Sequence, residues 1–385
     1  MLKWVQSGLS AVAGTAEPEY GREAIHTITD SIVNGNGDVA VSRDTTIKDF
    51  NWLCLDYTNV ETQTFYFTDL VNKYAGFAQI IHSNLMGVHT TAQFTFRLFH
   101  HDEDKAEDNI WTSTKLENFR TDGSNFYADK VSFELNDDNT TYTLKSHVTE
   151  EALVELTVTR LTPGVIFGKD GTTYYGDDVA NPWGSMRHLF WPRCTVNGTV
   201  KTPTQTFEIS GYTMFVMALQ GMKPHHAAKA WNFMNFHSKT YSAVQMEFTT
   251  PISYANTKVN VGIISKDGEI VLATINNVVL HQDPKEDPGV GWHVPTAITF
   301  KYIKDKKEEV AKDDDVVVGS VSGPLTTLVE RVDVMAEIPQ LVKNIVSGVV
   351  GTKPYIYQYC NEFDIEVGQD KEKGLGFTEV TFISE

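Results

Sequence analysis

TAQFTFRLF, residues 91–99, indicates the fold class, because its side chains alternate between apolar and polar. One face of this stretch carries Ala92, Phe94, Phe96 and Leu98, and the other carries Thr91, Gln93, Thr95 and Arg97. Successive side chains of a β-strand point to opposite faces of the sheet, so a period of two predicts a strand with one buried face. We therefore predict a sheet whose apolar face must be covered by other parts of the chain.

The same alternation recurs along the chain, interrupted by short polar turns. Residues 131–135 alternate in this way, and the Asn-Asp-Asp-Asn cluster at 136–139 leads into another alternating stretch. Residues 259–275 form a hairpin pattern around a Lys-Asp-Gly turn, and residues 363–367 alternate near the end of the chain. Long helices do not alternate with these strands, which disfavours a parallel α/β sheet. The sequence predicts an all-β protein with antiparallel β-barrels, and stacked sheets are the alternative.

The length of 385 residues suits two domains, each with its own core. We predict a first β-barrel domain over residues 50–210 and a second over residues 211–385, because a stretch rich in Thr, Pro, Ser and Gly at residues 200–212 separates two hydrophobic blocks. Residues 33–50 are rich in Gly, Asn, Asp and Thr and predict a linker. Residues 303–315 predict a charged, solvated loop in the second domain.

Residues 1–18 form a segment of their own, which opens with the amphipathic pattern MLKWVQSGLSAVAG. Its apolar face carries Met1, Leu2, Trp4, Val5, Leu9 and Val12. The helix is too short and too often interrupted by polar residues to cross a bilayer, but it can lie in the membrane interface. A secretory signal and a helix that packs on its own domain are the two alternatives.

Composition argues against phosphate-rich partners. Lys and Arg together number 32 against 50 Asp and Glu, which gives a net charge of −18. Nucleic-acid binding depends on clustered basic side chains, so we expect no nucleic-acid partner, and anionic lipid is disfavoured by the same reasoning. The three cysteines, Cys54, Cys194 and Cys360, are widely spaced and odd in number, which fits a reducing compartment. We expect each to be a core residue, with a redox sensor as the alternative.

Two blocks, residues 182–194 and 217–236, combine large apolar side chains with isolated polar ones, as in an apolar pocket with a few orienting groups. The candidate lipid-binding residues are Trp183, Met186, His188, Trp191, Met217, Trp231, Phe233, Met234 and Phe236. The common catalytic motifs are missing from the sequence, and we expect no catalytic residue, metal or cofactor. The alternative is acid–base chemistry at His188, His225, His226 or His237, beside Asp177 or Asp178.

Several stretches of the chain are distinctive: MLKW at 1–4, WTSTKLENF at 111–119, PWGSMRH and FWPRC at 182–194, MALQGMKPHHAAK at 217–229 and GTKPYIYQY at 351–359. Together they resemble the fungal survival-factor family of two-domain, lipocalin-like proteins. The resemblance implies a carrier that moves ceramide from the endoplasmic reticulum to the Golgi without vesicles and supports survival under oxidative stress. It also implies that an acetylated N-terminal amphipathic helix contacts the Golgi membrane.

These expectations describe a monomer in the cytoplasm, peripheral on Golgi and endoplasmic reticulum membranes, with the nucleus as a further location. Ceramide is uncharged, so its carrier needs an apolar cavity and a few hydrogen-bonding groups, but no basic cluster. Two other functions remain open: a lipocalin-like enzyme that acts on an isoprenoid or lipid in the barrel, and a stress-response scaffold with filled barrels.

Overall fold

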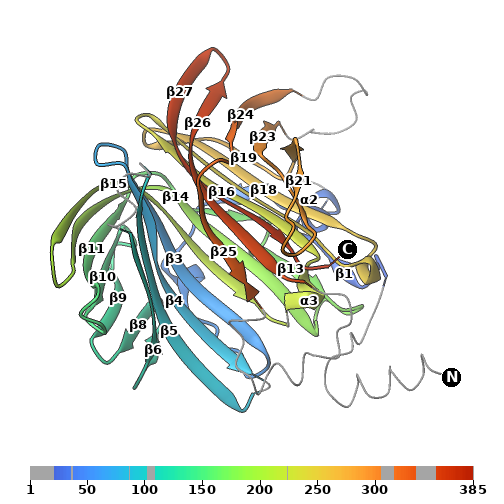
Figure 1. Cartoon of the computed structure of the whole chain (residues 1–385). Helices are drawn as coiled ribbons and strands as arrows, with labels where there is room; N and C mark the ends of the chain where they lie inside the picture. The colour runs from blue at the N-terminus through green and yellow to red at the C-terminus, as the bar shows by residue number, and fades with distance from the viewer. Residues whose placement is uncertain are drawn as a thin grey trace.

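The computed structural model describes residues 21–35, 38–85, 87–101, 109–222, 224–304, 316–334 and 353–384. Two antiparallel β-sheets dominate this part of the chain (Figure 1). The helical elements are α2 (Ile28–Val33), α3 (Pro224–Ala227) and the 3-10 turns at Ile47–Phe50 and Ile252–Tyr254. Within these described ranges, no helix has both the length and the apolar character needed to span a membrane.

The first sheet follows a continuous path of neighbouring strands. In spatial order these are β6 (Ile110–Leu116), β5 (His89–His100), β4 (Tyr74–Leu85), β3 (Asn59–Asp69), β15 (Thr206–Gln220), β14 (Gly184–Lys201), β11 (Leu153–Arg160), β10 (Thr141–Ser146), β9 (Val131–Leu135), β8 (Asn125–Ala128) and β7 (Arg120–Asp122). Four short strands extend it beside β14: β1 (Ile25–His26), β2 (Ser42–Arg43), β12 (Val165–Phe167) and β13 (Thr172–Tyr175).

The second sheet is built in the same way from the rest of the chain. In spatial order its strands are β19 (Glu269–Thr274), β18 (Lys258–Lys266), β17 (Tyr241–Thr249), β16 (Ala230–Ser238), β27 (Asp370–Phe382), β26 (Tyr355–Val367), β24 (Val317–Pro324), β23 (Ala297–Ile303) and β20 (Asn277–Gln282). β25 (Leu328–Asp333) pairs with β26, and a separate small ribbon joins β21 (Lys285–Glu286) to β22 (His293–Val294). The predicted all-β class with two barrel-like sheets is confirmed.

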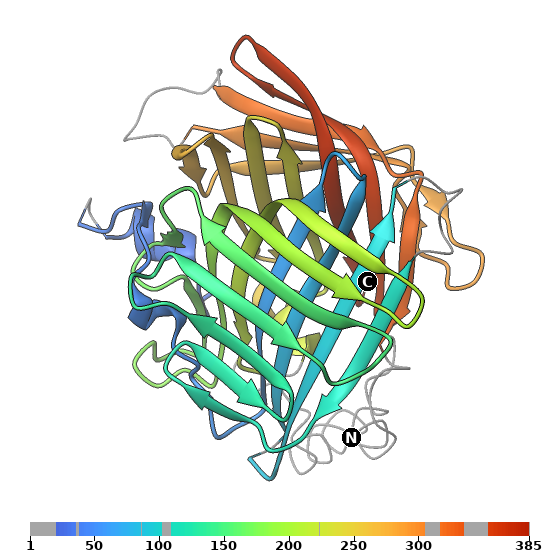
Figure 2. The same cartoon turned by 90° about the vertical axis from the view of Figure 1, so that its left-hand side faces the viewer.

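Each sheet curls around a core of its own, and the two sheets then pack against each other (Figures 1 and 2). The alternation in β5 explains this arrangement: Phe94 and Phe96 lie in the core enclosed by the first sheet, whereas Phe99 lies in the layer between the sheets. From the second sheet, Phe233 and Phe377 enter the same layer. The central strands of both sheets are therefore covered on both faces.

Side-chain hydrogen bonds fasten β20 across to β18, so that the second sheet curves back on itself. Asn260 donates from Nδ2 to the Asn277 carbonyl oxygen at 3.0 Å, and its Oδ1 accepts from the Asn277 backbone N–H at 3.1 Å. Gly262 provides the room for this approach, because a Cβ at that position would lie 2.3 Å from Asn277 Oδ1. A side chain at position 262 would therefore displace the Asn277 side chain from its place beside β18.

Two segments differ from the sequence-based expectation. The predicted domain boundary between residues 210 and 211 lies inside β15, and the change of sheet comes later, between Gln220 and Ala230. Within the stretch at 200–212, residues 202–205 form the turn that joins β14 to β15, where Thr202 N–H donates to the Gln205 carbonyl, and the residues from 206 on belong to β15. Part of the predicted linker is folded onto the first sheet, since β2 pairs with β12 and Phe50 is fully buried.

Other predicted segments cannot be compared with the structure. The amphipathic pattern of residues 1–18, with all six of its predicted membrane-binding side chains, lies outside the described residues. Nearly all of the predicted charged loop, residues 305–315, lies outside them as well.

Candidate functional site

The nine candidate lipid-binding residues lie in buried or partly buried positions, but they do not line one common cavity. Trp191 and Met217 lie in the first sheet's core, Met234 and Phe236 in the second sheet's core, His188 and Phe233 between the sheets, and Trp183, Met186 and Trp231 in a fourth cluster beside β1 and β13. Neighbouring residues of a strand point to opposite faces, which separates Phe233 from Met234 by the thickness of the sheet.

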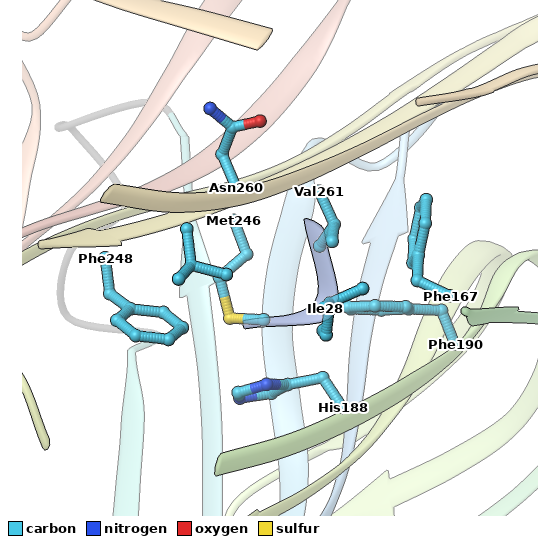
Figure 3. Close-up of a pocket in the computed structure, with 9 residues that line it drawn as sticks. Ile28, Phe167, His188, Phe190, Met246, Phe248, Asn260 and Val261 are labelled. Atoms are coloured by element: carbon cyan, nitrogen blue, oxygen red, sulfur yellow. The ribbon is translucent and has the colours of Figure 1, made fainter. Parts of the chain in front are cut away.

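A small pocket lies between the two sheets (Figure 3). Its walls are Ile28 from α2, Phe167, His188 and Phe190 from the first sheet, and Met246, Phe248, Val259, Asn260 and Val261 from the second. The cavity measures about 10 Å³, which is room for roughly one water molecule. A lipid chain enters here only if the two sheets separate.

The histidines proposed as alternative acid–base groups occupy different surroundings. Burial, assisted by the neighbouring Arg187, lowers the pKa of His188 to about 4, so that its imidazole is neutral near pH 7. His237 lies in a second buried place, where its Nδ1 is 2.6 Å from the Ser242 hydroxyl. The rings of His226 and Trp183 meet edge-on, with their centroids 5.7 Å apart. The side chain of His225 lies outside the described part of the molecule.

The inner face of the second sheet carries buried polar groups that the sequence analysis missed. Strand register places Met234 directly between Gln245 on β17 and Thr378 on β27, with all three side chains on the inner face. Both amide atoms of Gln245 and the Thr378 hydroxyl are buried without a hydrogen-bond partner among the described residues. The buried Tyr302 hydroxyl, from β23 in the same core, is unpartnered in the same sense.

The sequence around Gln245 has an alternating pattern, but that pattern indicates a solvent-exposed side chain and not the buried one that the structure shows. In YSAVQMEFT the polar Gln245 and Glu247 alternate with Val244, Met246 and Phe248, which is the pattern of a strand with one solvated face. The structure covers both faces, so Gln245 and Glu247 are buried. A buried polar group without a partner is costly, which makes this inner face a place where a ligand could supply the missing hydrogen bonds.

A chain of polar contacts links the two sheets near β5. Arg97 donates to Gln358 Oε1 at 3.2 Å and to Glu330 at 3.0 Å, and Gln358 Nε2 donates to Glu379 at 2.8 Å. Burial raises the pKa of Glu379 to about 7, although the hydrogen bond from Gln358 and the charge of Arg97 favour the carboxylate. These contacts fix how β5 lies against β25, β26 and β27.

Comparison with known proteins places these features in a family. The Svf1 family model matches residues 2–384. The chain is 65% identical to ceramide-binding protein SVF1 of Debaryomyces hansenii and 62% identical to that of Candida albicans, with each alignment covering all of both chains.

Solved structures with little sequence identity share the fold. A protein from Nitrosomonas europaea described as an AttH matches with a TM-score of 0.60 at 10% identity, over 89% of this chain and 98% of the other. Kievitone hydratase from Nectria haematococca matches with a TM-score of 0.52 at 12% identity, over 86% and 92%. These likenesses concern the fold alone. The full-length match to the family model and the identity to full-length relatives confirm the resemblance found in the sequence: the chain belongs to the Svf1 family.

Proposed function

We propose that this protein is a carrier of ceramide or a closely related neutral sphingolipid, which it moves from the endoplasmic reticulum to the Golgi without vesicles. Relatives that match over their whole length are named ceramide-binding proteins, which supports the choice of lipid. Through this transport the protein would support survival under oxidative stress. No bond is made or broken in the proposed function.

The inner face of the second sheet is the observation that carries the proposal. Ceramide has an amide and hydroxyl groups in its head and two long apolar chains, and it has no charge. The unpartnered groups are an amide on Gln245 and hydroxyls on Thr378 and Tyr302, surrounded by apolar side chains such as Met234 and Phe236. An amide and hydroxyls can satisfy the head by hydrogen bonds, and the apolar side chains suit the hydrocarbon. These residues are packed together in the structure, so loading requires the walls around them to separate.

The N-terminal segment supplies the proposed membrane contact. We place the protein in the cytoplasm as a monomer that attaches peripherally to Golgi and endoplasmic reticulum membranes, with the nucleus as a further location. The apolar face that includes Leu2, Trp4 and Leu9 would insert into the interface, and the nearly uncharged polar face suits neutral lipid. Attachment by one short helix is reversible, as a carrier requires.

Two matched substitutions test the lipid site. Gln245→Met removes the buried amide from the inner face, and Asn235→Leu removes one from the opposite face of the adjacent strand β16. Both amides are buried without partners among the described residues, so each variant should be more stable to urea by about 1 kcal/mol or more. Only Gln245→Met should weaken ceramide binding, by roughly tenfold for a lost hydrogen bond of 1.4 kcal/mol.

Binding is measured with fluorescent ceramide, and lipid that co-purifies with each variant is identified by mass spectrometry. Equal loss of ceramide in both variants would show that packing rather than the Gln245 amide matters. If the unaltered protein carries no sphingolipid and binds none, the carrier function is excluded.

A further inference from the structure

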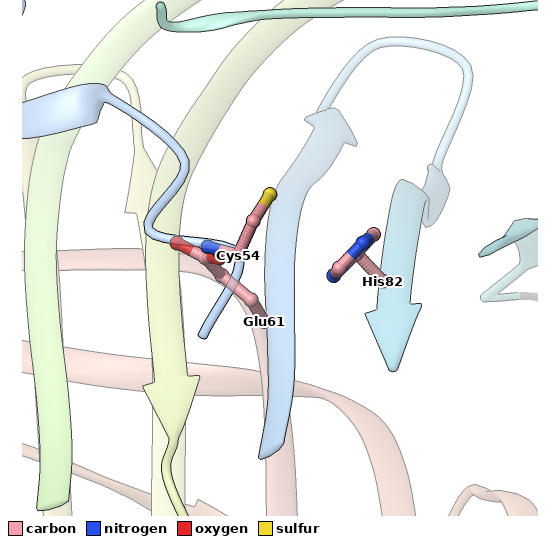
Figure 4. A group of neighbouring side chains, drawn as sticks. All are labelled: Cys54, Glu61 and His82. Carbon is pink, nitrogen blue, oxygen red and sulfur yellow. Dashed lines mark hydrogen bonds between the residues drawn. The ribbon is translucent and has the colours of Figure 1, made fainter. Parts of the chain in front are cut away.

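Three side chains that differ in chemistry meet at one end of the first sheet's core (Figure 4). Glu61 on β3 and His82 on β4 are directly opposite each other in the strand register, so their side chains leave the same face of the sheet. Cys54 comes from the loop that precedes β3. One potential ligand atom from each residue, the Cys54 sulfur, a Glu61 carboxylate oxygen and a His82 ring nitrogen, lies within 4.8 Å of the other two.

The loop is held over β3 by the carboxylate itself. The backbone N–H of Leu53 donates to both Glu61 oxygens, at 2.9 and 3.1 Å, and the N–H of Cys54 donates to one of them at 3.0 Å. Cys54 has a φ of +45°, in the left-handed region that residues other than Gly seldom adopt. Strained backbone of this kind persists where the surroundings impose it, and it clusters at binding sites.

The imidazole is ordered by packing but lacks a polar partner. His82 is 5% exposed, and the rings of Trp52 and Phe119 contact it with centroids at 6.1 and 5.9 Å. Its Nδ1 is buried without a hydrogen-bond partner among the described residues. A buried ring nitrogen that lacks a partner beside a thiol and a carboxylate is an available metal ligand.

The surroundings of the carboxylate also favour a cation. Glu61 is 1% exposed, and its carboxylate accepts hydrogen bonds from the backbone N–H groups of Leu53 and Cys54. Among the described residues, no Lys or Arg side chain forms an ion pair with this carboxylate. A bound divalent cation would supply the missing positive charge, and the Cys54 thiol would lose its proton to solvent on binding.

We propose that Cys54, Glu61 and His82 bind one zinc-like divalent cation, with a fourth position left to water. A thiolate, an imidazole and a carboxylate form a ligand set that suits Zn²⁺, whereas Ca²⁺ and Mg²⁺ prefer oxygen ligands alone. Cys54 is exposed, which gives the ion a route from solvent. The site differs from the metal-free protein expected from the sequence, and it is independent of the proposed lipid carriage.

Cobalt substitution tests the ligands in the full-length protein. Co²⁺ should bind with one equivalent per chain and give a near-ultraviolet thiolate charge-transfer band, and added Zn²⁺ should remove that band. Cys54→Ser should abolish the band, and His82→Asn should weaken Co²⁺ binding by more than roughly tenfold. His89→Asn, an exposed histidine on β5, is the matched control and should bind as the unaltered protein does. A band that persists in Cys54→Ser would overturn the assignment.

A measurement on the unaltered protein avoids any variant that fails to fold. Iodoacetamide alkylation of each cysteine is followed by mass spectrometry with and without Zn²⁺. Zinc should slow the alkylation of Cys54 at least severalfold and leave the slow reactions of the buried Cys194 and Cys360 unchanged. An unchanged rate at Cys54, together with no bound Co²⁺, would rule out the site.

Discussion

His188 is buried where the two sheets meet, and its surroundings determine its charge. Phe167 and Phe190 approach it from its own sheet, and Met246 and Phe248 from the other. The folded protein therefore holds a neutral imidazole, whereas the same side chain in the unfolded chain gains a proton near pH 6.5. Acidification consequently favours the unfolded state, in which the proton is accepted more readily.

We expect His188→Gln to reduce the acid sensitivity of the fold. Because the pKa of His188 falls from 6.5 to about 4 on folding, its contribution to stability is present above pH 6.5 and is lost as the pH falls toward 4. The loss amounts to roughly 3 kcal/mol at 1.36 kcal/mol per pKa unit. Urea unfolding between pH 7 and pH 4 should show a shallower decline for the variant, and the exposed His293→Gln should behave as the unaltered chain does. Parallel pH profiles for His188→Gln and the unaltered chain would contradict this account.

At the scale of single elements, side-chain hydrogen bonds cap the N-terminus of α2. The Thr27 hydroxyl accepts from the Asp30 N–H at 3.0 Å, and the Asp30 carboxylate in turn accepts from the Thr27 N–H at 2.9 Å. This capping box begins a helix of only 6 residues, whose Ile28 packs in the layer between the sheets.

Thr27→Ala should lower the free energy of unfolding by about 1 kcal/mol, because the first turn of α2 loses its side-chain partner. Thr27→Ser keeps the hydroxyl and should lose little of this stability. Urea denaturation of both variants makes the comparison. An equal loss in the two variants would assign the effect to the Thr27 methyl group, which is buried with the rest of the side chain.

A strand could be predicted from the sequence when only one of its faces is strongly apolar, and not when both faces are. The hairpin of β9 and β10 and that of β18 and β19 were predicted from alternation and are confirmed. β14 gave no such signal, and its block 182–194 suggested a pocket instead. Its Leu189 and Trp191 enter the first core while Phe190 lies between the sheets, so apolar residues follow one another without a polar face.

The candidate site was harder to predict for a related reason. Gln245 looks like a solvated residue, and only the strands that pair far along the chain show that it is buried. Met234 was selected for its size and lies beside Gln245 and Thr378, whereas Phe233, selected on the same grounds, points into the layer between the sheets. Composition identified suitable side chains, but the face each one occupies follows from register.

At the scale of the whole molecule, the layer between the sheets joins two units that each have an inner core. Aromatic contacts span it, for example between Tyr66 and Phe233 with ring centroids 5.0 Å apart. Hydrogen bonds also join the sheets. Arg193 on β14 donates to the Ser242 hydroxyl on β17 at 2.8 Å and to the carbonyl of Lys239, between β16 and β17, at 2.7 Å. Apolar burial and directed hydrogen bonds together set the relative position of the sheets.

If residues 1–18 form the proposed membrane contact, a charge on their apolar face should reduce membrane attachment without lowering the stability of the fold. Leu9→Asp should release the protein from neutral liposomes, because a charge on the apolar face opposes insertion. Gln6→Asp adds the same charge to the polar face and should weaken binding much less. Liposome flotation measures attachment and thermal unfolding checks the fold. A destabilised Leu9→Asp protein would show instead that the segment packs on its own domain.

The order of pairing has a consequence for synthesis on the ribosome. β3 can pair with β4 early, but its other edge stays open until β15 has been translated. β16 can likewise pair with β17, but its other edge must wait for β27 at the far end of the chain. Until then, the growing polypeptide presents open strand edges and uncovered apolar faces, which invite association with other chains. Chaperones would have to shield the nascent protein until its last strand is released, and a premature stop before residue 370 would leave the second sheet without its central strand.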